Sequence, residues 1–356
     1  MLTKLTRLMI WVVLALTVGL LPLYAGHAQS EEPDLSAIST YLLEHLESLK
    51  ENTTLLVEAA TRYYDLAEAA GFDYAALWET EQSEVSDAVL AAKDAWTAAS
   101  PLYEQVEGIV AGVPTLSEYD VILDAGASGE EDPEGGVPFD LTLRDGRVLE
   151  RPGNLFGLLE GTLWATRAEF STGITADLDG DGELQFGEAL PEANALLAMA
   201  ETMDSYVDEL LTAGQEWEPN LTDAFTALVV MTPTMSEYFG SWKASRFVMG
   251  DESEQTDFVV ISRLSDIQDI LGGLIVIYDN VSPLVAEADA DLHEQIETGL
   301  ADLLEYVQNI YQEEQDGRVF TAEEADFFGS EAQDRAMTIA GQITQAAALL
   351  NITLPE

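Results

Sequence analysis

Hydrophobic residues recur every three to four positions over most of this chain, which is the period of an amphipathic helix. From Asp34 to Gly71 the apolar positions follow one helix face, and Gly71 is suited to end the helix. A second run extends from Ala75 to Val110, with Pro101 as the predicted kink. Two long helices joined by a short connection are expected to pack antiparallel and to begin a bundle.

The rest of the chain repeats this helical pattern. Further helices are expected over Leu155 to Phe170, Pro191 to Leu211, Leu221 to Val230, Met235 to Phe247, Phe258 to Asn280, Leu284 to Tyr311 and Ser330 to Leu350. Pro233 and Pro283 are expected to separate neighbouring helices. Thr321 and Glu324 have the spacing of a capping box, which predicts a short helix before the last one.

Residues 112–153 depart from the helical period and are rich in glycine and acidic residues. Within them, residues 139–143 and 147–149 flank Asp145-Gly146, a dipeptide suited to a tight turn, so a β-hairpin is expected. The sequence therefore predicts a mainly α protein of two packed helical bundles, with an inserted β-hairpin and an EF-hand-type loop. The expected domains are a signal peptide at 1–28, a first bundle at 29–188 and a second at 189–356.

The N-terminus has the pattern of a secretory signal. Lys4 and Arg7 precede an apolar run from Leu8 to Leu23, and Gly26-His27-Ala28 offers a cleavage site after Ala28. An uncleaved membrane anchor is the alternative, because the run is slightly long for a signal. No later segment is apolar enough over a sufficient length to predict a membrane span. We expect a secreted or periplasmic protein.

The amino-acid composition limits the kinds of partner and metal site that we expect. The chain of 356 residues carries 66 acidic and 14 basic residues, a formal net charge of −52, and no cysteine. Nucleic acid and anionic membrane surfaces are excluded as expected partners because they carry the same sign of charge. Thiolate metal sites and disulfides are excluded as well. So large an acidic excess is typical of proteins from halophilic or salt-tolerant sources, where salt screens the self-repulsion.

The run from Asp177 to Glu188 has residue types and spacing that match an EF-hand calcium loop. Gly182 at the sixth position permits the sharp turn, and Leu184 at the eighth is the apolar anchor. Oxygen ligands favour Ca²⁺ over zinc or copper. The predicted ligands are Asp177, Asp179, Asp181, Glu183, Gln185 and Glu188. The alternative is a solvated acidic turn, although chance does not readily place glycine, leucine and the last glutamate in register.

Residues 91–107, AAKDAWTAASPLYEQVE, and residues 155–164, LFGLLEGTLW, resemble the imelysin-like family. This resemblance implies two helical bundles, a bacterial envelope location and a link to iron uptake; the family was once classed as peptidases. Its Gly-x-His-x-x-Glu helix aligns with Glu160, but the histidine falls on Gly157. The family's metal site is therefore incomplete here, and Glu107 with Glu160 is the carboxylate pair that the resemblance still allows.

Other candidates are weaker. His45 and His293 lack partners for nucleophilic or zinc chemistry, and His293 to Glu297 lacks the second histidine of a zinc-protease helix. Residues 312–323 partly match the pattern of the calcium loop, but glutamine stands where the pattern has its first aspartate, which favours a solvated segment. Lys243 and Arg246 lie beside aromatic residues and suit either an anionic ligand or, more simply, ion pairs with nearby carboxylates.

The resulting hypothesis is an extracytoplasmic, calcium-binding protein that serves as a metal-binding or iron-uptake accessory. Its cofactor is Ca²⁺, with iron or another transition metal as a second ion. Its expected partners are metal ions and a membrane metal permease or another envelope protein. An imelysin-type peptidase and a cell-surface interaction module are the alternatives, and the missing histidine argues against the enzyme.

Overall fold

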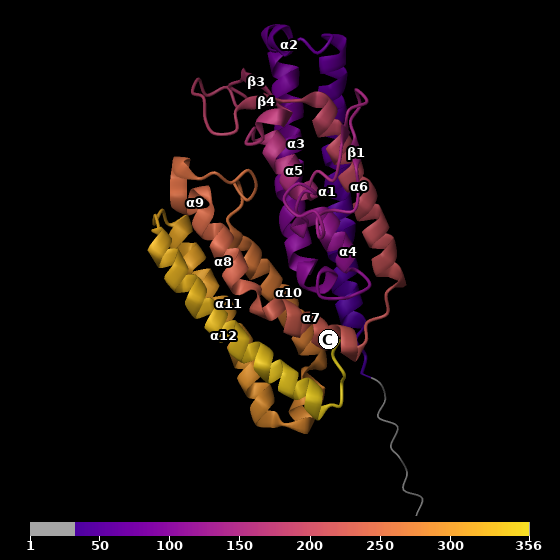
Figure 1. Cartoon of the computed structure of the whole chain (residues 1–356), viewed down its shortest axis with the longest axis vertical. Helices are drawn as coiled ribbons and strands as arrows, with labels where there is room; N and C mark the ends of the chain where they lie inside the picture. The colour runs from indigo at the N-terminus through magenta and orange to yellow at the C-terminus, as the bar shows by residue number, and fades with distance from the viewer. Residues whose placement is uncertain (1–32, 356) are drawn as a thin grey trace, which may run out of the picture. The chain divides into compact units, whose positions relative to one another are not determined.

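The structure, a computed structural model, describes residues 33–355, and from Asp34 onward they form one compact unit (Figure 1). The predicted signal peptide lies outside the described residues. The first half comprises α1 (Ser36–Ala69), α2 (Tyr74–Thr80), α3 (Gln82–Val110), α4 (Ser117–Asp120), the π-helical turn η1 (Val121–Ala125), β1 (Leu141–Thr142), β2 (Val148–Leu149), α5 (Leu155–Leu163), the 3₁₀ turn η2 (Ala168–Phe170), β3 (Ser171–Thr175), β4 (Ala189–Pro191) and α6 (Ala193–Glu216).

The second half is helical wherever it has regular structure. It comprises α7 (Leu221–Met231), η3 (Thr232–Thr234), α8 (Met235–Ala244), α9 (Arg246–Met249), η4 (Gly250–Glu252), α10 (Arg263–Ala288), α11 (Ala290–Gln315) and α12 (Ala322–Leu349). The mainly α fold class is confirmed, and so is the hairpin, because Leu141 pairs with Leu149 and Thr142 with Val148 around the predicted turn.

Two groups of helices make up this unit. In the first group, α1 packs against α3 and α6, and α5 packs against α3 and α6. The α1 core face carries Leu42, Leu46, Leu49 and Leu56, all fully buried at helical spacing. In the second group, α10 packs against α11, and α12 packs against α8 and α11. Helix α10 also packs against α3 and so links the groups (Figure 1).

The expected domain boundary between residues 188 and 189 precedes α6. That helix packs along α1 and against α5, and it buries residues such as Leu196, Met203 and Leu210 in the shared core. By its packing, α6 therefore belongs with the helices of the first group.

Several predicted helix ends were wrong. The run from Ala75 to Val110 divides at Glu81 into α2 and α3, and Pro101 lies inside α3. The helix from Leu155 was expected to reach Phe170, but α5 stops at Leu163 because Ala165 adopts a left-handed φ of 56°.

Two predictions about the second group also need correction. Pro283 does not end a helix but lies inside α10, where Ser282 Oγ donates a hydrogen bond to the Asp279 carbonyl that a proline cannot reach. The capping box of Thr321 and Glu324 is present, but it begins the long helix α12 rather than a separate short one.

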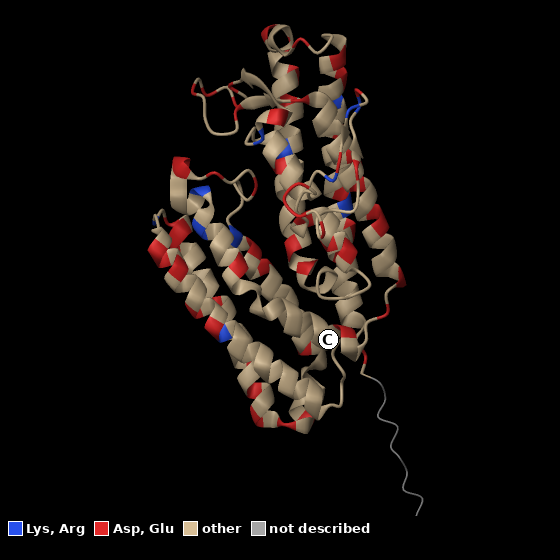
Figure 2. Cartoon of the chain, viewed as in Figure 1, with Lys and Arg blue, Asp and Glu red and all other residues tan. Residues whose placement is uncertain are grey.

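Helix α10 is long and apolar enough to cross a membrane by length and composition, with a mean hydropathy of 1.4 in its best window. It packs instead among α3, α7, α8 and α11, as the core helix of a bundle does. Acidic residues are spread over most of the helices and loops, with far fewer basic residues among them (Figure 2). The acidic excess is therefore distributed and does not form a single charged tail.

Candidate metal centre

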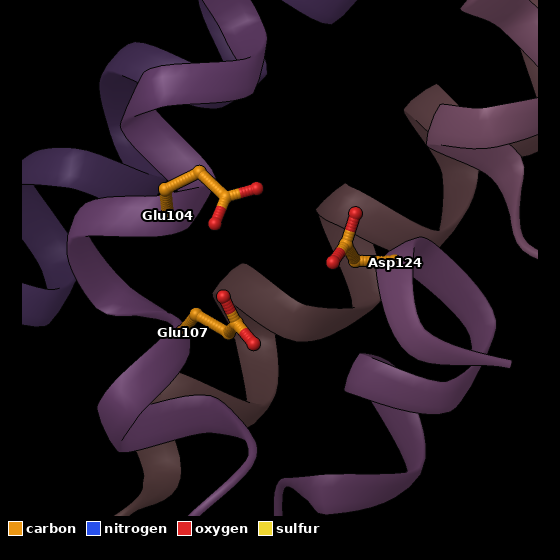
Figure 3. A group of neighbouring side chains, drawn as sticks. All are labelled: Glu104, Glu107 and Asp124. Atoms are coloured by element: carbon orange, nitrogen blue, oxygen red, sulfur yellow. The ribbon is translucent and has the colours of Figure 1, made fainter. Parts of the chain in front are cut away.

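Three buried carboxylates meet where α3 faces the turn η1. Glu104 and Glu107 lie one helical turn apart on α3, and Asp124 points toward them from η1 (Figure 3). One oxygen of each carboxylate lies within 4.8 Å of one oxygen of the other two. The residues are only 3%, 3% and 5% exposed, respectively. We call these three residues the acidic centre.

The local sequence explains this placement. Spacing of three residues puts Glu104 and Glu107 on the same face of α3, and this part of the helix is buried on its other faces too, where Tyr103 and Val106 lie in the core. The chain then reverses through α4 and widens into the π-helical turn, so that Asp124 projects back toward α3. Nearby, the Tyr103 hydroxyl donates a hydrogen bond of 2.8 Å to Asp120 Oδ1.

Two oxygens of the acidic centre are left without a donor. The Tyr238 hydroxyl, on α8, donates to Glu107 Oε1 at 2.5 Å. Oε2 of Glu107 and Oε2 of Glu104 are shielded from solvent and have no hydrogen-bond partner among residues 33–355. Since an unsatisfied buried polar group costs about 1–3 kcal/mol, and more when it is charged, these oxygens are candidate ligands for a cation.

The guanidinium of Arg263 pairs with acids of this region. Arg263 Nη1, at the start of α10, lies 2.8 Å from Asp266 Oδ2 and 3.8 Å from Glu104 Oε1. The guanidinium lies 4.7 Å from the ring centre of Tyr238 and 3.7 Å from that of Phe258. A single positive charge cannot balance the buried carboxyl groups around it, which are Glu104, Glu107, Asp120, Asp124 and Asp266.

Burial is the main reason why the pKa of each of these carboxyl groups is raised, and neighbouring carboxylates add to the effect. Burial, and then the carboxylates of Asp266 and Asp124, raise the pKa of Glu104 well above its usual value. Burial raises the pKa of Asp124 to about 6 and that of Asp266 to about 6, although Arg263 opposes both shifts. These groups therefore keep their protons to a higher pH than exposed carboxyls do, and the protons would compete with a cation for the same oxygens.

Glu160 does not join Glu107 in one ligand group. Its carboxylate, at the buried face of α5, accepts hydrogen bonds from the backbone N–H groups of Phe258, Val259 and Val260 at 2.6, 2.9 and 3.0 Å. Burial raises its pKa to about 8 even though these donors favour the charged form. Glu160 thus fixes the segment that places Phe258 on Arg263.

A small cavity of about 10 Å³ connects Glu160 to the acidic centre. Glu104, Asp124 and Gly157 also line it, and its volume is about that of one water molecule. A Cβ atom at position 157 would lie 3.1 Å from Asp257 Oδ2. The space beside Gly157, where the resemblance expects a histidine, is therefore partly occupied by Asp257.

In the calcium-type loop, ligand oxygens of Asp177, Asp179 and Glu188 lie within 4.8 Å of one another. Asp177 accepts hydrogen bonds from the N–H groups of Gly180 and Gly182, which have φ of 74° and 88°. The other predicted ligands are less convergent. Gln185 Nε2 donates to Asp181 Oδ2 at 2.7 Å, and Glu183 N donates to Asp181 Oδ1, also at 2.7 Å.

The elements that flank this loop differ from the expectation. Strands β3 and β4 lead into and out of it, with Ser171 paired to Pro191 and Thr175 to Ala189, so the loop is not the helix–loop–helix of an EF-hand. The loop is anchored to α3 by Lys93, whose Nζ donates to the Gly187 carbonyl at 2.7 Å. It also reaches α9, where the Arg246 guanidinium lies 3.4 Å from the centre of the Phe186 ring.

The remaining candidates lie outside the acidic centre. His45 Nδ1 is 2.7 Å from the Tyr41 carbonyl within α1, and His293 Nδ1 is 3.1 Å from the Tyr278 hydroxyl. Lys243 pairs with Asp326 at 2.8 Å and Arg246 pairs with Asp251 at 3.3 Å, as the simpler interpretation predicts.

Sequence reasoning missed most of the centre. Glu104 has the same-face spacing to Glu107, a signal present in the sequence, whereas Asp124 lies in a glycine-rich acidic stretch that looked like a loop. Nothing local distinguishes Arg263 and Tyr238 as its neighbours, because both come from helices more than 100 residues further along the chain.

The fold and the site together define a helical-bundle protein with a buried, oxygen-rich acidic centre between its helices. The family model described as Imelysin matches residues 42–350, which is most of the chain. This chain therefore belongs to the imelysin family, as its resemblance over 91–107 and 155–164 suggested. No curated protein matches the chain.

Proposed function

We propose that this protein is an extracytoplasmic metal-binding accessory of metal uptake, in which Glu104, Glu107 and Asp124 hold a hard cation. The observation that carries the proposal is that two buried carboxylate oxygens have no hydrogen-bond partner among the described residues. They belong to three carboxylates, each with one oxygen within 4.8 Å of an oxygen of the other two. Carboxylate oxygens suit hard cations such as Mn²⁺, Ca²⁺ or Fe³⁺. Iron is the ion that family membership favours.

The first experiment counts ions. We expect dialysis of the purified protein against Mn²⁺ to load the acidic centre with about one ion per chain, and the triple variant Glu104→Gln, Glu107→Gln, Asp124→Asn to lose that ion. Atomic emission measures the metal per chain, and circular dichroism verifies that the variant is folded. Equal manganese retention by the wild type and the folded variant would refute the site.

The calcium-type loop is proposed as a second, structural site. Wild-type protein in 10 mM CaCl₂ should gain about 1.4–2.7 kcal/mol of unfolding free energy over protein in chelator, because lone extracellular loops bind with a dissociation constant on the order of 10⁻⁴–10⁻³ M. The double variant Asp177→Ala, Glu188→Ala should lose the part of the calcium response in thermal unfolding that the loop supplies. The triple variant of the acidic centre is the matched control and should keep a calcium response; a wild type indifferent to calcium contradicts the loop site.

A further inference from the structure

A cavity of about 550 Å³ lies beside the acidic centre. Glu107 and Asp124 form part of its wall, together with Tyr238 and Arg263, and Arg167 and Gln255 line it as well. A volume of this size is in the range of pockets that hold small organic molecules. A single cation at the acidic centre leaves nearly all of this space to a second component.

Arg167 supplies this cavity with a positive charge that has no partner. None of the ion pairs or hydrogen bonds found within residues 33–355 engages its side chain, and its Nε is shielded from solvent without an acceptor. The nearby carboxylate of Glu131 already accepts hydrogen bonds from the Ser128 hydroxyl at 2.9 Å and the Ser128 N–H at 3.1 Å. These bonds lower the pKa of Glu131 more than the charge of Arg167 does. In so acidic a chain, a guanidinium without a carboxylate partner is available to an external anion.

Gly161 holds Arg167 in this position. A Cβ atom at residue 161 would lie 2.6 Å from Arg167 Cγ and 3.0 Å from Nε. The arginine stem therefore lies directly on the glycine of α5, and any side chain there would displace it. This packing fixes the stem of a residue that also lines the cavity, so its guanidinium is the group that we expect to meet a ligand there.

The charge on the wall decides what kind of anion can enter. Seven carboxylates and two guanidiniums line the cavity. A free polyanion is repelled by this excess, whereas a polyanion that already chelates a cation brings the charge that the acidic centre lacks. Highly charged hard cations also hydrolyse in neutral water unless oxygen chelators hold them.

We propose that the cavity takes the cation as a complex with a small polycarboxylate, with the metal at the acidic centre and a chelator carboxylate on Arg167. This inference rests on the proposed metal-binding function and adds the chemical class of what is bound. Arg167 should favour the complex over the bare ion, because its guanidinium can donate two parallel hydrogen bonds to a carboxylate of the chelator and has no such partner on a bare ion.

The test uses ferric citrate prepared with radiolabelled citrate and the full mature chain. After rapid desalting, wild-type protein should retain iron and citrate in equal amounts, and labelled citrate without iron should not be retained. Arg167→Gln should lower the affinity for ferric citrate by roughly 10- to 100-fold, the value of a lost charge-assisted hydrogen bond. Iron supplied from ferric acetohydroxamate, which has no carboxylate, should bind this variant as it binds the wild type.

Arg62→Gln is the matched control, because Arg62 is exposed on α1 and does not line the cavity. The affinity of this variant for ferric citrate should not change.

Iron retained without citrate by the wild type overturns the chelate proposal and leaves the metal site standing. Citrate bound equally well without iron, or an Arg167→Gln variant with unchanged affinity, overturns it too. A wild type that takes iron from neither complex refutes the iron-binding form of the function and the chelate proposal together, whereas the manganese experiment tests the acidic centre independently.

Discussion

Replacing Arg263 with methionine is expected to lower the unfolding free energy of the metal-free protein by about 3–5 kcal/mol at pH 8. Arg263 is the only guanidinium paired with the buried carboxyls in the described part of the chain, at 2.8 Å from Asp266 and 3.8 Å from Glu104. Methionine keeps much of the side-chain volume but leaves these acids buried without a counter-charge. Urea unfolding followed by circular dichroism measures the loss.

The dependence on pH identifies the cause of this loss. Since the pKa values of Asp266 and Asp124 are raised to about 6, both groups become protonated below that pH, and the effect of removing Arg263 should shrink. Adding Asp266→Asn to the variant should restore part of the stability. Lys243→Met, which breaks the exposed pair with Asp326, is the control and should cost no more than about 1 kcal/mol. A loss for Arg263→Met that is the same at pH 5 and pH 8 would point to packing instead of charge.

Glu107→Gln is expected to act with opposite signs in the two metal states. In the metal-free protein it should raise stability, because it removes one of several mutually repelling buried carboxylates, while its amide oxygen can still accept from Tyr238. With metal at 100 times the wild-type dissociation constant, wild type gains about 2.7 kcal/mol and the variant should lose most of this gain. Thermal unfolding with Mn²⁺ and with chelator measures both effects.

The sign of the pH dependence follows from the raised pKa values. Carboxyls whose folded pKa exceeds the unfolded one stabilise the protein at low pH, and this contribution is lost as pH rises from 3.8 through about 6 for Asp124 and Asp266. The gain from Glu107→Gln in metal-free protein should therefore be larger at pH 8 than at pH 5. Glu237→Gln, the same change at an exposed acid of the same cavity, should alter neither state. A metal-free Glu107→Gln protein that is less stable than wild type at pH 8 would contradict the excess of buried negative charge.

The helices and the hairpin could be predicted because their signals are local. The leucines of α1 repeat at helical spacing, and Asp145-Gly146 identifies the turn between β1 and β2. Helix ends were less predictable, since they depend on single backbone conformations such as that of Ala165. The strands that flank the calcium-type loop were not predicted for a different reason, because β3 forms only by pairing with β4.

The sequence by itself determined the mainly helical class, the acidic character and the family resemblance, since these follow from periodicity, composition and short runs of residues. Only the tertiary structure decided which carboxylates form the centre. Periodicity shows that Glu107 lies on a helix, but it does not show that the Asp124 carboxylate lies beside it. Nor does it show that the Glu160 carboxylate accepts hydrogen bonds from the backbone N–H groups of Phe258, Val259 and Val260. Those neighbours are set by how distant elements pack, and the charge balance that raises the pKa values exists only once Arg263 and the acids are buried together.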